Sequence, residues 1–199
     1  MPEYEVVLRA ADAVLSHGRA QVDLGIDANG RIGSIALPGT LTGRTIVDAA
    51  GLIAVPGGID LHVHINTFFG GTTTRDDFLA GTSAALFGGT TTVAQFAIPR
   101  PGETSLEAVQ RTKTEARPTA VGDYAIHGAM VRETFTQSLE QLPDLRAAGV
   151  GTVKVFSAYT DVLGLTLGQI HRLLERAAVQ DVTVFVHAET DSLDRKSVV

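Results

Sequence analysis

The stretch AVPGGIDLHVHINTFFGG, residues 54–71, places two histidines in a run that otherwise has the composition of a buried strand. Side chains at positions i and i+2 of a strand point to the same face, so Asp60, His62 and His64 share one face and the aliphatic residues between them share the other. The aliphatic face is expected to pack beneath helices. The polar face then points into a barrel or cleft, where two neutral imidazoles can bind one metal ion. A pair of hydrogen-bonded core histidines is the alternative, and it is less favoured because the pair ends a strand directly before a Gly-rich loop.

Strand and helix patterns alternate from this point to the end of the chain. The patterns predict strands at 58–65, 91–99, 121–131, 151–159 and 182–189, and helices at 75–89, 105–116, 136–149 and 166–180. Asp76 or Asp77 can cap the first helix, Gly88 and Gly89 can end it, and Pro143 interrupts the third helix. This alternation is typical of βα units on a parallel sheet, so the predicted fold class is α/β.

Residues 1–55 have a different pattern. Short runs rich in Val and Ile are separated by turns, and Asn29-Gly30 between two such runs is a strong hairpin signal. No segment in this part has a helical pattern. We therefore expect a β-meander.

Composition excludes several classes of protein. The chain has 199 residues, of which 44% are hydrophobic, so it can build a core. Its net charge of −6 argues against nucleic-acid binding, and it contains no cysteine for a disulfide or thiolate metal site. No apolar run is long enough to cross a membrane, and the start lacks the apolar region of a signal peptide. A cytoplasmic protein is the expectation.

Lys154 and His187 are two further polar residues on inward-facing strand positions. Lys154 lies between Val153 and Val155, so it points away from the helix-packed face, and its strand offers no carboxylate. Burial lowers a lysine pKa, and a neutral amine can react with carbon dioxide to give an anionic carbamate that can bridge two cations. The alternative is a lysine that extends to solvent from the strand end. His187 ends the last strand, and side chains at the carboxyl ends of parallel strands converge in a barrel.

The other histidines and one repeat are assigned structural positions. His17 is expected in an exposed part of the meander, His171 on a helix surface, and His127 in a structural role. The sequence FGGTTT occurs at 69–74 and 87–92 without the lysine of a P-loop, so both copies are interpreted as structural loops.

The segments PGGIDLHVHINTFFGGTTTRDDFLAGTSAALFGGTTTVAQF, VKVFSAY and VFVHAE resemble the hydantoinase/dihydropyrimidinase branch of the amidohydrolase superfamily. The resemblance extends to about residue 191. It implies an incomplete TIM (β/α)8 barrel, with about five of the eight strands, at 56–193. It also implies that 1–55 form part of a small β-sandwich.

The resemblance further implies a site that holds two divalent metal ions, with zinc as the expected metal. His62 and His64 correspond to ligands of one ion, Lys154 to a bridging N6-carboxylysine, and His187 to a ligand of the second ion. Tyr159 corresponds to a tyrosine whose hydroxyl binds the substrate and the developing oxyanion. Relatives commonly form homotetramers.

The implied reaction is hydrolysis of a cyclic amide C–N bond by a metal-activated hydroxide, which opens a dihydropyrimidine or hydantoin ring to an N-carbamoyl amino acid. No arginine follows His64 closely, since the first is Arg75, and this favours a ring without a carboxylate. Asn66 replaces the expected aspartate and HVHIN is similar to allantoinases, so an allantoinase-like activity is one alternative. A catalytically silent dihydropyrimidinase-related assembly protein is the other. It is disfavoured because all four implied metal-binding residues are present.

The resemblance places the remaining barrel strands, a further metal-binding histidine and a proton-shuttling aspartate downstream of this chain. Residues 194–199, DRKSVV, are interpreted as a non-native tail. The expectation is therefore a truncated fragment with little or no turnover and poor solubility. The sequence does not select the natural ring, its stereochemistry or the oligomeric state.

Overall fold

The computed structural model describes residues 3–69, 71–159 and 161–190. Its contacts divide the chain into two compact units, Met1–Gly57 and Gly58–Val199. The proposed tail at 194–199 lies outside the described residues. Within the described residues, no helix is both long and apolar enough to cross a membrane.

The first unit contains one β-sheet. Its strands are β1 (Tyr4–Leu15), β2 (Gly18–Ile26), β3 (Ile32–Ala36), β4 (Gly43–Asp48) and β5 (Ile53–Ala54). β1, β2 and β3 are antiparallel neighbours, as a meander requires. β4 and β5 instead pair with β1 in parallel, so the meander prediction is wrong for these two strands. β2 occupies only one edge of the long β1, and the backbone groups on its other edge need partners.

A buried carboxylate holds an irregularity in β1. The β1–β2 register shifts between Leu8 and Ala11, and Ala10 has a φ of 58°. Asp23 of β2 accepts the Ala10 N–H at 2.9 Å. It also accepts the N–H groups of Gly39 and Leu41, at 2.9 and 3.3 Å, from the loop after β3. Asp23 therefore joins the bulge to that loop.

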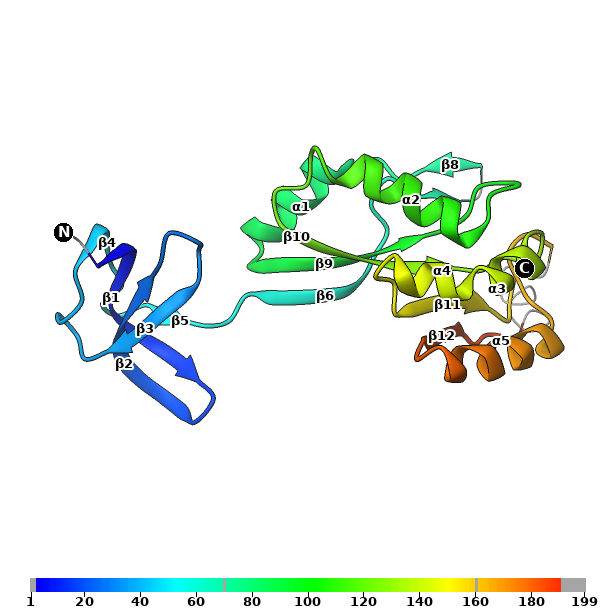
Figure 1. The fold of residues 1–199 in the computed structure, drawn as a ribbon. Helices are drawn as coiled ribbons and strands as arrows, with labels where there is room; N and C mark the ends of the chain where they lie inside the picture. The colour runs from blue at the N-terminus through cyan, green and yellow to red at the C-terminus, as the bar shows by residue number, and fades with distance from the viewer. Residues whose placement is uncertain (1–2, 70, 160, 191–199) are drawn as a thin grey trace. The chain divides into compact units, whose positions relative to one another are not determined.

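The second unit has an α/β architecture (Figure 1). Its sheet has the order β12-β11-β10-β9-β6, and every neighbouring pair is parallel. The strands are β6 (Gly58–Val63), β9 (Thr90–Ala97), β10 (Asp123–Ala129), β11 (Thr152–Phe156) and β12 (Thr183–His187). The helices are α1 (Phe78–Phe87), α2 (Ser105–Ala116), α3 (Phe135–Glu140), α4 (Leu142–Ala147) and α5 (Leu167–Val179). The sheet curls into half a barrel, which confirms the predicted incomplete TIM barrel.

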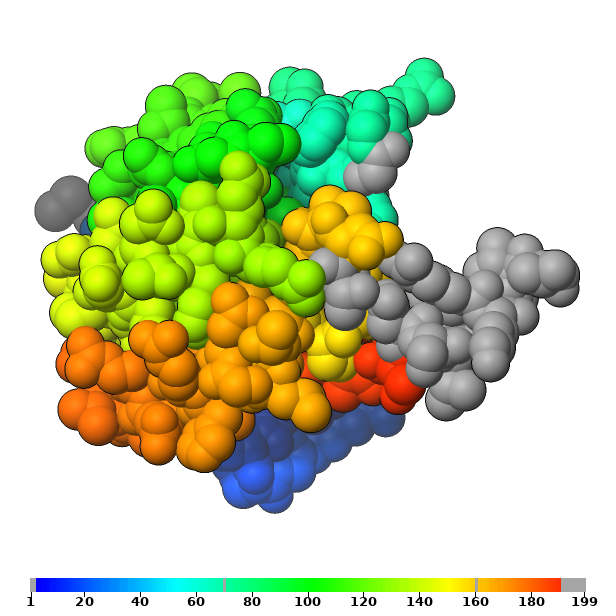
Figure 2. Space-filling model, turned by 90° about the vertical axis from the view of Figure 1, so that its right-hand side faces the viewer, coloured from blue at the N-terminus to red at the C-terminus, as the bar shows by residue number. Residues whose placement is uncertain are grey.

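Local signals explain where the helices begin and break. The Asp77 side chain accepts the Ala80 N–H at the start of α1, and capping boxes begin α2 at Thr104 and α5 at Thr166. The predicted helix at 136–149 is two helices, because Pro143 lies in the first turn of α4, where its missing N–H costs little. In Figure 2 the green, yellow and orange segments follow one another around the surface, as successive βα units do.

Three apolar clusters pack against the sheet. The largest joins outward-facing strand residues to the helices, and includes Val109, Leu142, Val153, Val155 and Leu173. The second includes Phe96, Ala129, Phe156 and Leu163. The third includes Phe78 of α1 and Val93 of β9. In β6 only Val63 packs as the aliphatic pattern predicts. Ile59 and Leu61 are 66% and 61% exposed, so that prediction is wrong for them. β6 is an edge strand of the described sheet.

Candidate functional site

The carboxyl end of β6 presents the two histidines on one side, as the strand pattern predicts. The ring centroids of His62 and His64 are 5.2 Å apart. The Asp60 side chain accepts the His62 N–H at 2.9 Å and so braces this end of the strand. Burial, followed by the nearby charges of His62 and Lys154, lowers the pKa of His64. The neutral imidazole, which is the form that binds metals, is therefore favoured at His64.

Lys154 lies on β11, and only 8% of it is exposed. Its Nζ atom lies 5.3 Å from the ring centroid of Phe96 and 5.6 Å from that of Phe156. No carboxylate among the described residues forms an ion pair with it. Burial lowers the pKa of Lys154, because an ammonium ion is poorly solvated there. The expectation that Lys154 points away from the helices is consistent with these ring contacts.

His187 ends β12, and one of its ring nitrogens is available to bind a metal ion. Its Nε2 lies 2.9 Å from Glu189 Oε2. The alignment is not that of a hydrogen bond, so this buried nitrogen has no hydrogen-bond partner among the described residues. The Ser157 N–H and hydroxyl both donate to the His187 carbonyl at 3.0 Å. β11 therefore holds the end of β12 in place.

Tyr159 has a strained backbone beside this strand end. Its φ is 57°, a left-handed value that is rare for an aromatic residue. The Tyr159 carbonyl accepts the N–H groups of residues 162, 163 and 164, each at 2.9 Å, which stabilises this conformation. The ring centroids of Tyr159 and His187 are 5.4 Å apart.

One cavity of about 410 Å³ brings the predicted residues together. Its lining includes all five residues selected from the sequence: His62, His64, Lys154, Tyr159 and His187. The remaining lining residues are Thr67, Phe69, Thr74, Ile98 and Phe156. The cavity thus lies at the carboxyl ends of the strands, where side chains from β6, β11 and β12 converge.

Sequence reasoning did not identify Phe96, whose ring lies close to His62, His64 and Lys154. It is 2% exposed, and its ring centroid lies 4.7 Å from that of His62 and 5.5 Å from that of His64. Strand parity could have placed Phe96 on the inward face of β9, although an apolar residue in a strand suggests no function. His127 is buried beside Phe96 and contacts Thr152 and the Leu61 carbonyl, consistent with its expected structural role.

The first FGGTTT copy contributes to the cavity, which the sequence did not indicate. Its described residues contribute to the short antiparallel strands β7 (Phe68–Phe69) and β8 (Thr72–Thr73). Thr74 then accepts the Thr67 N–H through its hydroxyl at 2.8 Å, and its own N–H donates to the Thr67 carbonyl at 2.9 Å.

His17 and His171 are exposed, as expected.

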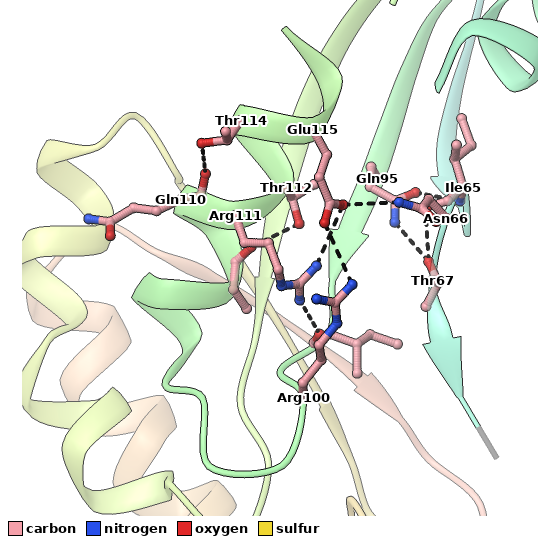
Figure 3. A network of polar contacts seen from close by, with 12 residues as sticks. Ile65, Asn66, Thr67, Gln95, Arg100, Gln110, Arg111, Thr112, Thr114 and Glu115 are labelled. Atoms are coloured by element: carbon pink, nitrogen blue, oxygen red, sulfur yellow. Dashed lines mark hydrogen bonds and ion pairs between the residues drawn. The ribbon is translucent and has the colours of Figure 1, made fainter. Parts of the chain in front are cut away.

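A polar network lies behind the loop that follows His64 (Figure 3). Gln95 of β9 and Glu115 of α2 reach this loop from separate elements. Glu115 in turn lies 3.6 Å from Arg100 and 3.7 Å from Arg111. Arg111 also donates to Glu103 at 2.9 Å.

The donors around the cavity suit divalent metal ions only as a mixed set. Among residues 3–69, 71–159 and 161–190, no group of three or more His, Cys, Asp or Glu side chains could hold an ion by itself. The available donors are the imidazoles of His62, His64 and His187 together with the amine of Lys154. The unbonded, buried Nε2 of His187 and the lowered pKa values of His64 and Lys154 fit such a set.

Comparisons with known proteins agree on one family. A model described as the amidohydrolase family matches residues 53–198. A D-hydantoinase of Geobacillus stearothermophilus is 42% identical over 149 residues, which are 74% of this chain and 31% of that protein. A dihydropyrimidinase of Rattus norvegicus is 36% identical over 154 residues, 77% of this chain and 30% of that protein.

Solved structures give the same result. A D-hydantoinase structure superimposes with a TM-score of 0.89 at 31% identity, covering 96% of this chain and 41% of its own. The chain therefore spans less than half the length of each of these relatives.

Proposed function

Because this chain belongs to the amidohydrolase family, we propose that the full-length protein hydrolyses the C–N bond of a cyclic amide. The products would be N-carbamoyl amino acids, formed from dihydropyrimidine or hydantoin rings. The observation that carries this proposal is that one cavity is lined by all five residues, His62, His64, Lys154, Tyr159 and His187. The D-hydantoinase and dihydropyrimidinase names of the relatives support the class of substrate.

His62, His64 and His187 would hold two divalent cations, for which zinc is our expectation, together with Lys154. When bound, such cations polarise a carbonyl oxygen and make hydroxide available near neutral pH. His62 lies on β6 and His64 directly after its end, whereas His187 lies on β12. Phe96 packs against the rings of His62 and His64 and limits their movement.

Lys154 would contribute as N6-carboxylysine. The neutral amine forms an N–C bond with carbon dioxide, one C=O π bond becomes the electron pair of a carboxylate, and the amine loses a proton to solvent. Burial lowers the pKa of Lys154 and so favours the neutral amine that this step requires. The product carries two oxygen donors in place of one cationic group.

Tyr159 would bind the substrate carbonyl and stabilise negative charge that develops on its oxygen. Its backbone conformation is held by the three N–H groups that its carbonyl accepts. Loss of the hydroxyl should lower kcat more than it raises KM.

The cavity favours an uncharged ring. No arginine is among the residues that line it within the described ranges. A substrate carboxylate would therefore lack the bidentate guanidinium partner that such groups commonly use. This supports dihydrouracil, dihydrothymine or a 5-substituted hydantoin over a carboxylated ring.

An assay of the purified full-length protein with dihydrouracil, hydantoin and allantoin tests the proposal. We expect ring opening of dihydrouracil or hydantoin, abolished by Tyr159→Phe combined with His62→Ala. Turnover of allantoin alone would contradict the proposed substrate class. No turnover together with no bound metal would favour a silent assembly protein. We also propose a homotetramer, which light scattering on the same sample would test.

A further inference from the structure

We infer that Gln95 is a positioning residue that holds His64 at the cavity. This inference rests on the proposed function, since it concerns a residue proposed to bind metal. Gln95 lies on β9, is 2% exposed and does not line the cavity. Both atoms of its side-chain amide bond to groups at the carboxyl end of the sheet (Figure 3).

Gln95 supplies a hydrogen bond where the strand ladder between β6 and β9 stops. The last paired residues of the two strands are Val63 and Gln95 itself. The Ile65 N–H, which belongs to the peptide that follows His64, donates to Gln95 Oε1 at 2.7 Å. The side chain therefore takes the place of the next backbone acceptor. Without it, this buried N–H would have no partner, and such a loss is costly.

The hydrogen bonds of the Gln95 amide nitrogen fix the direction of the amide oxygen. Gln95 Nε2 donates to the Thr67 hydroxyl and to the Phe96 carbonyl, each at 2.9 Å. The Thr67 hydroxyl in turn donates to the Ile65 carbonyl at 3.2 Å. Because Nε2 has two acceptors, Oε1 is directed at the Ile65 N–H. The loop after His64 is thus held through both the N–H and the carbonyl of Ile65.

Asn66 adds a second hold on the same turn. Its φ is 47°, in the left-handed region, which asparagine tolerates better than most residues. Its N–H donates to the Asp76 carbonyl at 2.9 Å, and its side chain donates to Glu115 at 3.2 Å. The chain therefore turns immediately after Ile65 and cannot carry β6 further. His64 therefore lies between the end of β6 and this turn, and both neighbours are held in place.

Partners outside the ligand set commonly change metal affinity by about 10- to 100-fold when they are removed. We expect Gln95→Leu, which keeps the volume but loses all three side-chain hydrogen bonds, to weaken cobalt(II) binding to the full-length protein by about tenfold or more. In the metal-free protein, hydrogen exchange at the Ile65 amide should be about tenfold faster. Neither readout depends on turnover.

Thr67→Val and Thr67→Ser form a second pair in case Gln95→Leu does not fold. Valine removes the hydroxyl that accepts from Gln95, whereas serine keeps it, so serine should restore both readouts. Thr134→Val is the matched control. Thr134 is a buried threonine away from this loop, and its hydroxyl donates to the Glu103 carbonyl at 2.8 Å. This control should lower stability without selective exposure of the Ile65 amide.

The outcomes separate the two proposals. If the unmodified protein binds no cobalt(II), the proposed metal site fails, while the Ile65 exchange rates still test the role of Gln95. If the unmodified protein binds the metal, and Gln95→Leu and Thr67→Val bind it equally well with a protected Ile65 amide, the positioning role is wrong. If Thr134→Val has the same effect as Thr67→Val, the effect is one of general stability, which also overturns the inference.

Discussion

Lys154 is buried on β11, where an ammonium ion is poorly solvated and the pKa of the amine is therefore lowered. A neutral amine in this position can accept carbon dioxide. We therefore expect the protein to incorporate ¹³C from labelled bicarbonate as a carbamate on this residue, visible by ¹³C NMR. Lys154→Met should lack that resonance, since it keeps the apolar stem but has no amine.

The control for this prediction is Lys113→Met on α2. Lys113 is a partly buried lysine that donates to the Ala148 carbonyl instead of lying against aromatic rings. Its loss should leave the carbamate resonance unchanged. A resonance that survives Lys154→Met would place the modification on another amine and contradict our assignment.

The buried Asp23 carboxyl is expected to make the stability of the first unit depend on pH. Burial raises the pKa of this carboxyl, but the three N–H donors of Ala10, Gly39 and Leu41 outweigh burial, and the net pKa lies below its ordinary value of 3.8. A carboxyl whose folded pKa is lowered stabilises the fold fully above the unfolded pKa, and this contribution is lost as pH falls through the folded pKa.

Asp23→Asn should therefore destabilise this unit by about 1–3 kcal/mol near neutral pH, because it directs an NH2 group at N–H donors. Thermal unfolding of the two proteins between pH 7 and about pH 2 would test this. The difference should shrink as the pH falls below 3.8. A difference that stays constant over this range would contradict the role given to the charge.

At the residue scale, strand parity singled out His62, His64, Lys154 and His187, because a polar residue is conspicuous among aliphatic ones. Only their expected convergence at the carboxyl ends of the strands favoured a metal site over separate structural roles. Tyr159 was selected only through a family resemblance. Phe96 and Gln95 were not selected at all. A phenylalanine in a strand looks like ordinary core, and the role of Gln95 depends on where a neighbouring strand ends.

Among the elements, α2 has the clearest start signal. The Thr104 side chain accepts the Glu107 N–H at 3.3 Å, and the Glu107 side chain accepts the Thr104 N–H at 2.8 Å. Thr104→Ala should cost about 1 kcal/mol of unfolding free energy, whereas Thr104→Ser should cost much less. Chemical denaturation measures both. Thr114→Ala, in the body of the same helix, is the matched control and should be neutral or slightly stabilising, and an equal loss there would refute the capping role.

Helices were easier to predict than strand partners. The helix predicted at 105–116 has the same bounds as α2. Its start was predictable because the sequence contains a capping box. In contrast, the parallel pairing of β4 and β5 with β1 was missed, since apolar alternation identifies a strand but says nothing about its neighbour. The split into α3 and α4 was visible at Pro143, although its exact place depends on packing.

For the molecule as a whole, the sheet of the second unit has two open edges in the described residues, β6 and β12. Ile59 and Leu61 on β6 and Val186 on β12 are exposed. Open edges with apolar side chains favour association between chains. We expect the 199-residue chain to self-associate in light scattering, and Leu61→Lys to reduce this. A monodisperse monomer without the substitution would contradict the prediction.

The half-barrel could be predicted as a whole because its βα alternation is regular. The parts of the two relatives that the chain does not match could not be predicted from it, since it covers only 31% and 30% of their lengths. The site proposed above is therefore the part of a metal centre that this chain itself supplies.

The most direct test of that centre is an anomalous-scattering map, recorded at the zinc absorption edge from crystals of the full-length protein. Our account predicts peaks in the cavity bounded by His62, His64, Lys154 and His187, with continuous density that joins a carboxylated Lys154 side chain to them. Peaks elsewhere, or a cavity without any peak in crystals grown with zinc, would contradict it.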